Sequence, residues 1–403
     1  MSRVLRLGIA GLGIASDQVL PHIGAIADRV QLTAGADVQA DAVRAFQARY
    51  PDAQGFASVE AMCRSADVDV IWVATPNDYH AEHAILAARH GKHVVCEKPM
   101  AISIEQCNDI IAAVNEHHVH YVQGHSKIYY APLRKMREII RSGALGRVTQ
   151  ISSWNYNDWL IRPVTEKEVM TSEGAGPVFR QGPHQVDIVR YLAGKRALSV
   201  RAQCGRHEAA YPQTESDYSA FVTFEDGVSA NLVFQAQGYF DSAELTWSLG
   251  ESGFRMLNAD SVRPRERRHR AMSAAEKYEF QKKGDPYGRG QAGLEDKKAK
   301  RHQPFFGITL VSCERGLLRQ SPDGVYIYDA AGRREIACEA PVKRGAAELI
   351  ELWDALEENR KPFLDAHWGR ATLEVCMAML RSSDDKREVM LEHQSPFVAL
   401  SDW

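Results

Sequence analysis

Residues 6–16 read RLGIAGLGIAS, an apolar run that ends in two closely spaced glycines. After this turn, Val19, Leu20, Ile23 and Ile26 recur at helical spacing. A strand, a glycine turn and a helix in this order are typical of dinucleotide-binding folds, in which the glycines permit a tight turn and close approach to a pyrophosphate. The stretch therefore predicts a Rossmann-type α/β domain in the first part of the chain.

The same motif indicates the cofactor. Gly11 and Gly13 supply the first two small positions of the glycine fingerprint, Ile14 completes the turn, and Ser16 is an imperfect third position. The next predicted strand ends in Asp37, whose carboxylate can accept hydrogen bonds from ribose hydroxyls and repels a 2′-phosphate. No arginine follows it immediately, so the pattern favours NAD and leaves NADP as the alternative. Asp37 as a simple turn cap is the other interpretation.

Strands and helices continue to alternate through the first third of the chain. We expect strands at 31–36, 68–74, 94–96 and 119–123 and helices at 42–50, 58–66, 81–90 and 103–117. This alternation predicts a doubly wound parallel sheet. The ligand crevice of such a sheet lies beyond the carboxyl ends of its strands.

Two loops follow such strand ends. Thr75, Pro76 and Asn77 interrupt regular structure ahead of a helix that begins near His80, and we assign these four residues to the cofactor site beside the nicotinamide. An ordinary strand-to-helix turn is the alternative. The second loop carries Glu97-Lys98-Pro99.

The Glu97-Lys98-Pro99 tripeptide is the first catalytic candidate. Pro99 fixes the backbone and biases Lys98 away from helical dihedral angles. A lysine held at a strand end can present its ammonium to a substrate hydroxyl, with Glu97 beside it at the cofactor. A surface ion pair at a strand end is the alternative.

Composition narrows the class of protein. The chain has 403 residues, 45% of them hydrophobic and 25% charged, with a net charge of −3, which is ordinary for a globular protein and gives no indication of nucleic-acid or membrane binding. No apolar run approaches the roughly 18–20 residues of a membrane span. The first residues run straight into a strand pattern, so we expect no signal peptide. The seven cysteines are scattered and lack a Cys-x-x-Cys spacing, which argues against a disulfide framework and against a cysteine-rich metal site, and favours a reducing cytoplasm.

The later part of the chain is richer in strands. We expect strands at 149–154, 199–206, 218–224, 229–235 and 244–249, with a hairpin turn at Asp226-Gly227 and another hairpin at 325–336. Residues 261–301 hold 13 Lys/Arg against 6 Asp/Glu and indicate a solvated, basic insertion. We expect helices near 345–359 and 370–384 to pack on this second body.

The glycine turn, the Thr75-Pro76-Asn77 loop with His80 and the Glu97-Lys98-Pro99 tripeptide, in this order, resemble the Gfo/Idh/MocA family of oxidoreductases. The resemblance covers nearly the whole chain. It implies an NAD(P)-binding Rossmann domain at 1–125 and an α/β domain at 126–403 built on a large, open, mostly antiparallel sheet. It also implies a small-molecule substrate and a homo-oligomer formed through that sheet.

A second motif extends the resemblance. The family usually shows Asp-x-Gly-x-His-x-x-Asp at a helix start, which Gly182, His184 and Asp187 match, whereas Arg180 replaces the first aspartate. The resemblance implies that Lys98 and His184 are the proton-transfer and orienting groups at the reacting hydroxyl. This is chemically sensible, because a histidine can take the hydroxyl proton and an ammonium stabilises alkoxide character. A histidine that only packs or caps the helix is the alternative.

The departure at Arg180 bears on the substrate. A guanidinium is a fork for a carboxylate, so Arg180 with Gln181 indicates a substrate that carries one. Lys127, Trp154 and Arg315 are further candidates for substrate binding. The alternatives are that Arg180 pairs with a protein acid and that Trp154 belongs to the core.

A narrower resemblance follows from residues 302–316 together with 180–184, which look like the phthalate cis-dihydrodiol dehydrogenase branch of the family. It implies oxidation of a carboxylated cyclic diol such as 4,5-dihydro-4,5-dihydroxyphthalate. A sugar or inositol dehydrogenase, an NAD-recycling eliminase or glycosidase, and a non-catalytic NAD-binding sensor are the alternatives.

Overall fold

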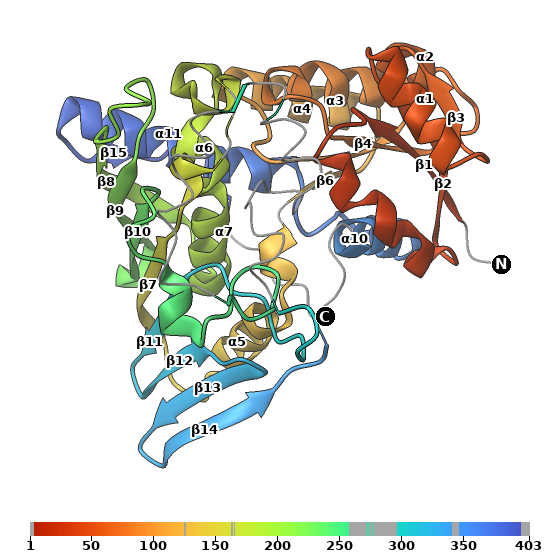
Figure 1. Cartoon of the computed structure of the whole chain (residues 1–403). Helices are drawn as coiled ribbons and strands as arrows, with labels where there is room; N and C mark the ends of the chain where they lie inside the picture. The colour runs from red at the N-terminus through yellow and green to blue at the C-terminus, as the bar shows by residue number, and fades with distance from the viewer. Residues whose placement is uncertain are drawn as a thin grey trace. The chain divides into compact units, whose positions relative to one another are not determined.

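The computed structural model describes residues 4–124, 126–162, 164, 166–257, 272–273, 276, 296–340 and 346–395 of the chain (Figure 1). These residues form two compact units. The first unit contains the described residues up to 126 together with 346–373, and the second contains those from 127 to 340 together with 374–395. The expected basic insertion at 261–301 lies largely outside the described residues.

The first unit is built on a six-stranded parallel sheet, which confirms the doubly wound fold. Its strand order is β3-β2-β1-β4-β5-β6, the arrangement of a Rossmann fold. The strands are β1 (Leu5–Ala10), β2 (Val30–Ala36), β3 (Gln54–Phe56), β4 (Val70–Val73), β5 (His93–Cys96) and β6 (Tyr121–Gln123). Because β4 and β5 are covered on both faces, nearly all of their residues are buried.

The connections of this sheet are mostly helical. They include α1 (Ala40–Arg49), α2 (Val59–Cys63), α3 (His80–Arg89) and α4 (Ile104–Glu116). Ser103 caps α4, since its side chain accepts a hydrogen bond from the Gln106 amide. The segment after the glycine turn differs from a regular α-helix. It forms the 3₁₀ segments η1 (Ser16–Gln18) and η2 (Leu20–Ile26), and a mid-segment Gly24 disfavours an α-helix there.

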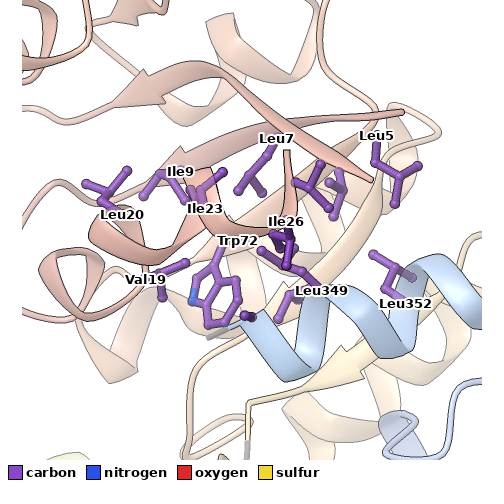
Figure 2. Close-up of a cluster of buried hydrophobic side chains, with 14 of the residues drawn as sticks. Leu5, Leu7, Ile9, Val19, Leu20, Ile23, Ile26, Trp72, Leu349 and Leu352 are labelled. Atoms are coloured by element: carbon purple, nitrogen blue, oxygen red, sulfur yellow. The ribbon is translucent and has the colours of Figure 1, made fainter. Parts of the chain in front are cut away.

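A helix from the far end of the sequence completes the core of this unit. Leu349 and Leu352 of α10 (Ala346–Glu357) are fully buried against Leu5, Leu7 and Trp72 (Figure 2). The expectation that the helix near 345–359 packs on the second body was therefore wrong. An amphipathic pattern shows that one face of a helix is covered, but it does not identify the sheet that covers it.

We expect Leu349→Ala to destabilise the first unit by about 2–5 kcal/mol, because the truncation leaves a cavity in a closely packed core. Denaturant unfolding followed by intrinsic fluorescence measures the loss. Leu245→Ala, at a leucine that is 44% exposed, is the control and should change stability by no more than about 0.5 kcal/mol. Equal effects of the two substitutions would contradict this packing.

The second unit is built on a nine-stranded sheet in the order β14-β13-β12-β11-β7-β10-β9-β8-β15. Only β7 and β10 pair in parallel, and the other neighbouring strands are antiparallel. The open, mostly antiparallel sheet is therefore confirmed. Its strands are β7 (Val148–Tyr156), β8 (Ala197–Gly205), β9 (Asp217–Phe224), β10 (Ser229–Gln235), β11 (Ile308–Cys313), β12 (Gly316–Gln320), β13 (Gly324–Asp329), β14 (Gly332–Ala337) and β15 (Val389–Met390).

One face of this sheet is covered by helix α7 (Gly182–Ala193), which lies against β7 and β10 (Figure 1). All twelve residues of α7 are buried. Among the described residues, the other α-helices that contribute to this unit are α5 (Ala131–Arg141), α6 (Gly176–Arg180) and α11 (Ala366–Asp385), the last of which supplies residues to both units. The opposite face of the sheet exposes large side chains, among them Trp154 at 40% and Phe221 at 48%.

Turn chemistry explains one confirmed and one failed expectation. Asp226 and Gly227 both have positive φ, at 59° and 75°, and join β9 to β10 as the predicted hairpin. The strand expected at 244–249 is instead the 3₁₀ segment η9 (Ser242–Thr246), capped by Asp241. Across the described residues, no helix combines the length and apolarity that crossing a membrane requires.

Candidate active site

In the first unit, the glycine turn after β1 approaches the loop after β4. Gly11 has φ +91°, and a Cβ at this position would lie 2.8 Å from the Ala74 carbonyl oxygen and 2.9 Å from the Thr75 amide nitrogen. Only glycine satisfies both the dihedral angle and this contact. A Cβ on Gly13 would meet no atom within 4 Å outside its chain neighbours, so Gly13, which Ile14 follows, borders open space.

Asp37 holds this turn in place. One carboxylate oxygen accepts a hydrogen bond from the Leu12 amide at 2.9 Å, and the other accepts one from the Gln39 amide at 2.8 Å. The turn-capping interpretation therefore describes a real interaction. It does not compete with cofactor binding, because each carboxylate oxygen has two lone pairs and can also accept a ribose hydroxyl.

The loop Thr75-Pro76-Asn77 is partly accessible, and its Thr75 hydroxyl lies 3.0 Å from Nδ1 of His83. His80, which the sequence assigned to the cofactor, is different. Its ring is 1% exposed and lies between two protein carbonyls, with Nδ1 2.7 Å from the Pro99 oxygen and Nε2 2.8 Å from the Thr75 oxygen. Both ring nitrogens therefore face the protein, so His80 does not present its ring to a cofactor.

The charge state of His80 is subject to opposing effects. Burial lowers its pKa, whereas the two carbonyl oxygens and the carboxylate of Glu97 act to raise it and the Lys98 ammonium to lower it. The net direction is downward. A neutral ring donates one hydrogen bond only, so the tautomer decides which carbonyl it serves.

Lys98 lies two residues after the end of β5 and is 9% exposed. The peptide bond between Lys98 and Pro99 is cis. Glu97, half-buried beside it, donates its amide to the Val73 carbonyl at 2.9 Å, which continues the pairing of β5 with β4 by one residue. The lysine thus stands at the carboxyl end of a central strand, as the sequence predicted.

In the second unit, His184 lies in the first turn of α7, directly after Gly182 and Pro183. Proline is well suited to this place because a first-turn amide needs no intrahelical acceptor. The imidazole of His184 is buried and packs edge-on against the ring of Phe306, with 5.1 Å between ring centroids. Gln181 is also buried and occupies the N-cap position of the helix.

Phe306 also contacts Lys127. The ammonium of this fully buried lysine lies 4.6 Å from the centre of the Phe306 ring and forms an ion pair with Glu251. The structure therefore brings Lys127 close to His184 through one aromatic ring. Glu251 and Phe306 were not among the predicted site residues, since their partners are far away in sequence. Because Glu251 neutralises Lys127, this lysine is better suited to shaping the surroundings of His184 than to binding a carboxylate.

Two predicted substrate-binding residues lie elsewhere in this unit. Ser153 faces α7, where its hydroxyl accepts a hydrogen bond from Gln185, so strand alternation turns Trp154 to the opposite face of the sheet. Arg315 is exposed in the turn between β11 and β12, and its guanidinium donates to the carbonyls of Gly143 and Ala144. Strand β11 separates it from Phe306, a span of roughly 20 Å at about 3.3 Å per residue. Neither side chain accompanies His184.

Among the described residues, no group of three or more His, Cys, Asp or Glu side chains could hold a metal ion.

Comparison with known proteins identifies the family. Residues 5–125 match the model of an oxidoreductase family with an NAD-binding Rossmann fold, and residues 133–251 match the GFO/IDH/MocA C-terminal domain. The chain belongs to the Gfo/Idh/MocA family of oxidoreductases. It is thus an NAD-binding enzyme of the dehydrogenase type.

Individual relatives align with this chain over nearly its full length. 1-Carboxy-3-chloro-3,4-dihydroxycyclohexa-1,5-diene dehydrogenase of Comamonas testosteroni is 34% identical over 383 residues, which are 93% of this chain and 94% of the relative. A crystal structure from Bordetella bronchiseptica RB50, assigned to the dehydrogenases, superposes with a TM-score of 0.85 at 32% identity and covers 96% of this chain and 100% of its own. Levoglucosan dehydrogenase in complex with NADH and levoglucosan shares the fold, with a TM-score of 0.72 at 15% identity over 96% and 99% of the two chains.

Arg180, the departure from the family's usual motif, ends α6. Its guanidinium nitrogen Nη2 lies 3.1 Å from Oε1 of Glu168, and its side chain is 31% exposed. The pairing with a protein acid that the sequence left open is therefore present. A guanidinium has five N–H donors in a fixed fork, so it can hold Glu168 and a second carboxylate at the same time.

The loop that precedes α6 is held by a buried carboxylate. Thr171 donates its hydroxyl to Oε2 of Glu215 at 2.9 Å, and Arg206 lies 3.3 Å from the other oxygen. Glu215 is fully buried, and burial raises its pKa above the ordinary value of 4.5. The neutral form is therefore favoured in the folded protein relative to the unfolded chain.

We expect Glu215 to make stability depend on pH. Since its pKa is higher in the folded state, its contribution is complete below about pH 4.5 and is lost as pH rises through the folded-state pKa. Glu215→Gln removes this titration. The difference in unfolding free energy, wild type minus variant, should fall as pH rises from about 4 to 7, measured by urea denaturation. A difference that is constant or rises with pH would contradict the assignment.

Proposed function

We propose that this enzyme oxidises a secondary alcohol on a carboxylated ring, with 4,5-dihydro-4,5-dihydroxyphthalate as the representative substrate. The observation that carries the proposal is the partly exposed guanidinium of Arg180, four residues before His184, where the family's motif usually has an aspartate. The name of the Comamonas relative supports it, because it describes a ring with one carboxyl group and two hydroxyls. Arg180 would bind a substrate carboxylate, and the buried Gln181 next to it would help to shape that pocket.

The proposed chemistry is hydride transfer from the carbinol carbon to the nicotinamide ring, which NAD supplies when bound. As the carbonyl forms, the hydroxyl proton must leave. We assign its removal to Lys98 and His184, of which one accepts the proton and the other orients the oxygen. Both side chains are at least nine-tenths buried, and exclusion of water strengthens such interactions.

The cofactor assignments follow the first unit. Gly11, Gly13 and Ile14 would lie along the pyrophosphate, Asp37 at the adenosine ribose, and Thr75-Pro76-Asn77 with Glu97 near the nicotinamide. Asp37 favours NAD over NADP by charge repulsion of the 2′-phosphate. For a dihydrodiol the oxidised ring tautomerises to a catechol, and the gain of aromaticity makes the oxidation strongly favourable.

The enzyme with NAD and the phthalate dihydrodiol should therefore form NADH, followed by its absorbance, and less so with NADP. Arg180→Ala should lower kcat/KM for this substrate about 10- to 100-fold, the worth of a hydrogen bond to a charged group. The same change should have little effect on a diol without a carboxylate. Glu168→Gln is the matched control, because it alters the same ion pair and keeps the guanidinium.

Turnover of inositol or a sugar with no response to the dihydrodiol would overturn the substrate class. In that case Arg180 would be a structural partner of Glu168, and the enzyme a polyol dehydrogenase of the same family.

We further propose that the enzyme acts in the cytoplasm, where its free cysteines stay reduced.

We also propose that the chain forms homo-oligomers through the exposed face of the nine-stranded sheet. Trp154 of β7 and Phe221 of β9 lie on that face on either side of β10, since Val233 of β10 pairs with Trp154 and Asn231 of β10 with Phe221. Exposed apolar side chains grouped in this way are typical of protein interfaces.

Light scattering should give a molar mass for the wild type that is a multiple of the chain mass. Trp154→Arg combined with Phe221→Arg should return it to that of one chain, because charges replace the apolar contact. Val38→Arg, at a residue of the first unit that is 84% exposed, is the control and should leave the mass unchanged. A wild-type protein that is monomeric at assay concentrations would contradict the proposal.

A further inference from the structure

We infer that His80 and Gln123 are positioning residues for Lys98, which they hold by binding the main-chain carbonyls on both of its sides. The inference rests on the proposed role of Lys98 at the reacting hydroxyl. The proposed contacts are with the main chain and not with the ammonium of Lys98. Their contribution is to fix the main chain from which the ammonium is presented.

The first contact comes from β6. The side-chain amide of Gln123 donates hydrogen bonds to the carbonyl of Cys96 at 2.9 Å and to that of Glu97 at 3.1 Å. The Glu97 carbonyl belongs to the peptide that precedes Lys98, so this contact fixes the plane of that peptide. Gln123 is fully buried.

The orientation of the Gln123 amide is itself determined. The Tyr121 hydroxyl donates to Oε1 of Gln123 at 2.7 Å, so the amide nitrogen must point to the two carbonyls. Gly369 closes the other side, because a Cβ there would lie 2.6 Å from Oε1 of Gln123. The side chain therefore has no room to turn away from the chain ahead of Lys98.

The second contact comes from the start of α3. Nδ1 of His80 lies 2.7 Å from the Pro99 carbonyl, one residue beyond Lys98. Nε2 of the same ring lies 2.8 Å from the Thr75 carbonyl, in the loop that we assign to the nicotinamide. His80 therefore lies between the segment that carries Lys98 and the loop assigned to the nicotinamide, and its neutral ring donates to one of the two carbonyls, which we take to be that of Pro99.

The two contacts approach β5 from its two neighbours in the sheet. Gln123 belongs to β6, and His80 follows the loop after β4, while β5 lies between β4 and β6. Such an arrangement opposes displacement of Lys98 toward either side. A displacement of about 1 Å can cost an enzyme about 100-fold in rate, so loss of either contact should act on the chemical step.

Substitutions of His80 can test the contributions of its two ring nitrogens one at a time. An asparagine amide nitrogen occupies approximately the place of Nδ1, and a glutamine amide nitrogen that of Nε2. His80→Asn therefore keeps a donor for Pro99, and His80→Gln keeps one for Thr75. Gln123→Met removes both donors of Gln123 at similar size. The Cys96 carbonyl retains the Gly124 amide at 2.7 Å in that variant.

We expect His80→Ala and Gln123→Met to lower kcat about 10- to 100-fold with the dihydrodiol, while the dissociation constant of NADH, from fluorescence titration, changes less than about 3-fold. His80→Asn should recover most of the rate, and His80→Gln should not. The pH at which kcat reaches half its maximum should also shift in the impaired variants, because the environment of the Lys98 ammonium changes. Should Gln123→Met fail to fold, Gln123→Glu removes the same donors and keeps the acceptor for Tyr121.

The matched control is His120→Asn. His120 is also a histidine of the first unit whose ring nitrogen approaches a main-chain carbonyl, that of Arg360 at 2.9 Å, but it precedes β6 at the opposite end of the strand. This substitution should affect stability without changing kcat. A rate loss in His120→Asn as large as those in the His80 and Gln123 variants, at an equal loss of stability, would overturn the inference.

A second readout does not depend on turnover. The rate at which an amine-directed acylating reagent modifies Lys98, followed by mass spectrometry of the peptide, reports directly on its presentation. It should change several-fold in His80→Ala and Gln123→Met and stay unchanged in His120→Asn. An unchanged rate in all variants would overturn the positioning role. A changed rate in an enzyme that oxidises none of the alcohols would instead overturn the proposed function and leave the positioning role intact.

Discussion

The hydrogen-bond register at the carboxyl ends of the parallel strands is the constraint on which the first unit's candidate site depends. At each of these ends the pairing of strands continues one residue into the following loop. The bonds run from the amides of Gly11, Ala74, Glu97 and Gly124 to the carbonyls of Ala36, Ala10, Val73 and Cys96, at 2.7 to 2.9 Å. Each loop therefore begins at a position set by the neighbouring strand. The glycine turn, the Thr75 loop and Lys98 thus take their relative places first from the sheet, and contacts such as those of Asp37 and Gln123 add to this constraint.

The sequence predicted what is encoded over short distances. The alternation of strands and helices, the glycine turn, the Ser103 cap and the Asp226-Gly227 hairpin all follow from residue types within a few positions of one another. The helix expected at 20–26 and the strand expected at 244–249 both proved to be 3₁₀ segments. The apolar spacing of each segment suits more than one conformation, and turn-forming residues determined which one the chain adopts. Periodicity alone cannot make that choice.

The contacts between side chains that define the candidate site could not be predicted from local sequence patterns. Arg180 lies against Glu168, Lys127 against Glu251, and Phe306 against both Lys127 and His184. Most of these contacts join positions that are far apart in the chain, so no local pattern predicts them. His80 illustrates the same limit, because its loop reads as accessible, whereas the fold buries its ring between two carbonyls.

Helix α10 carries a consequence for how the protein is made. The Rossmann unit is discontinuous in sequence, since the helix that covers Leu5, Leu7 and Trp72 is encoded after the entire nine-stranded sheet apart from its short edge strand β15. During synthesis on the ribosome, part of the apolar surface of the amino-terminal domain therefore stays uncovered until more than 200 further residues have been made. Domains that wait in this state are the usual clients of chaperones. The NAD-binding domain therefore becomes complete only after α10 has been synthesised.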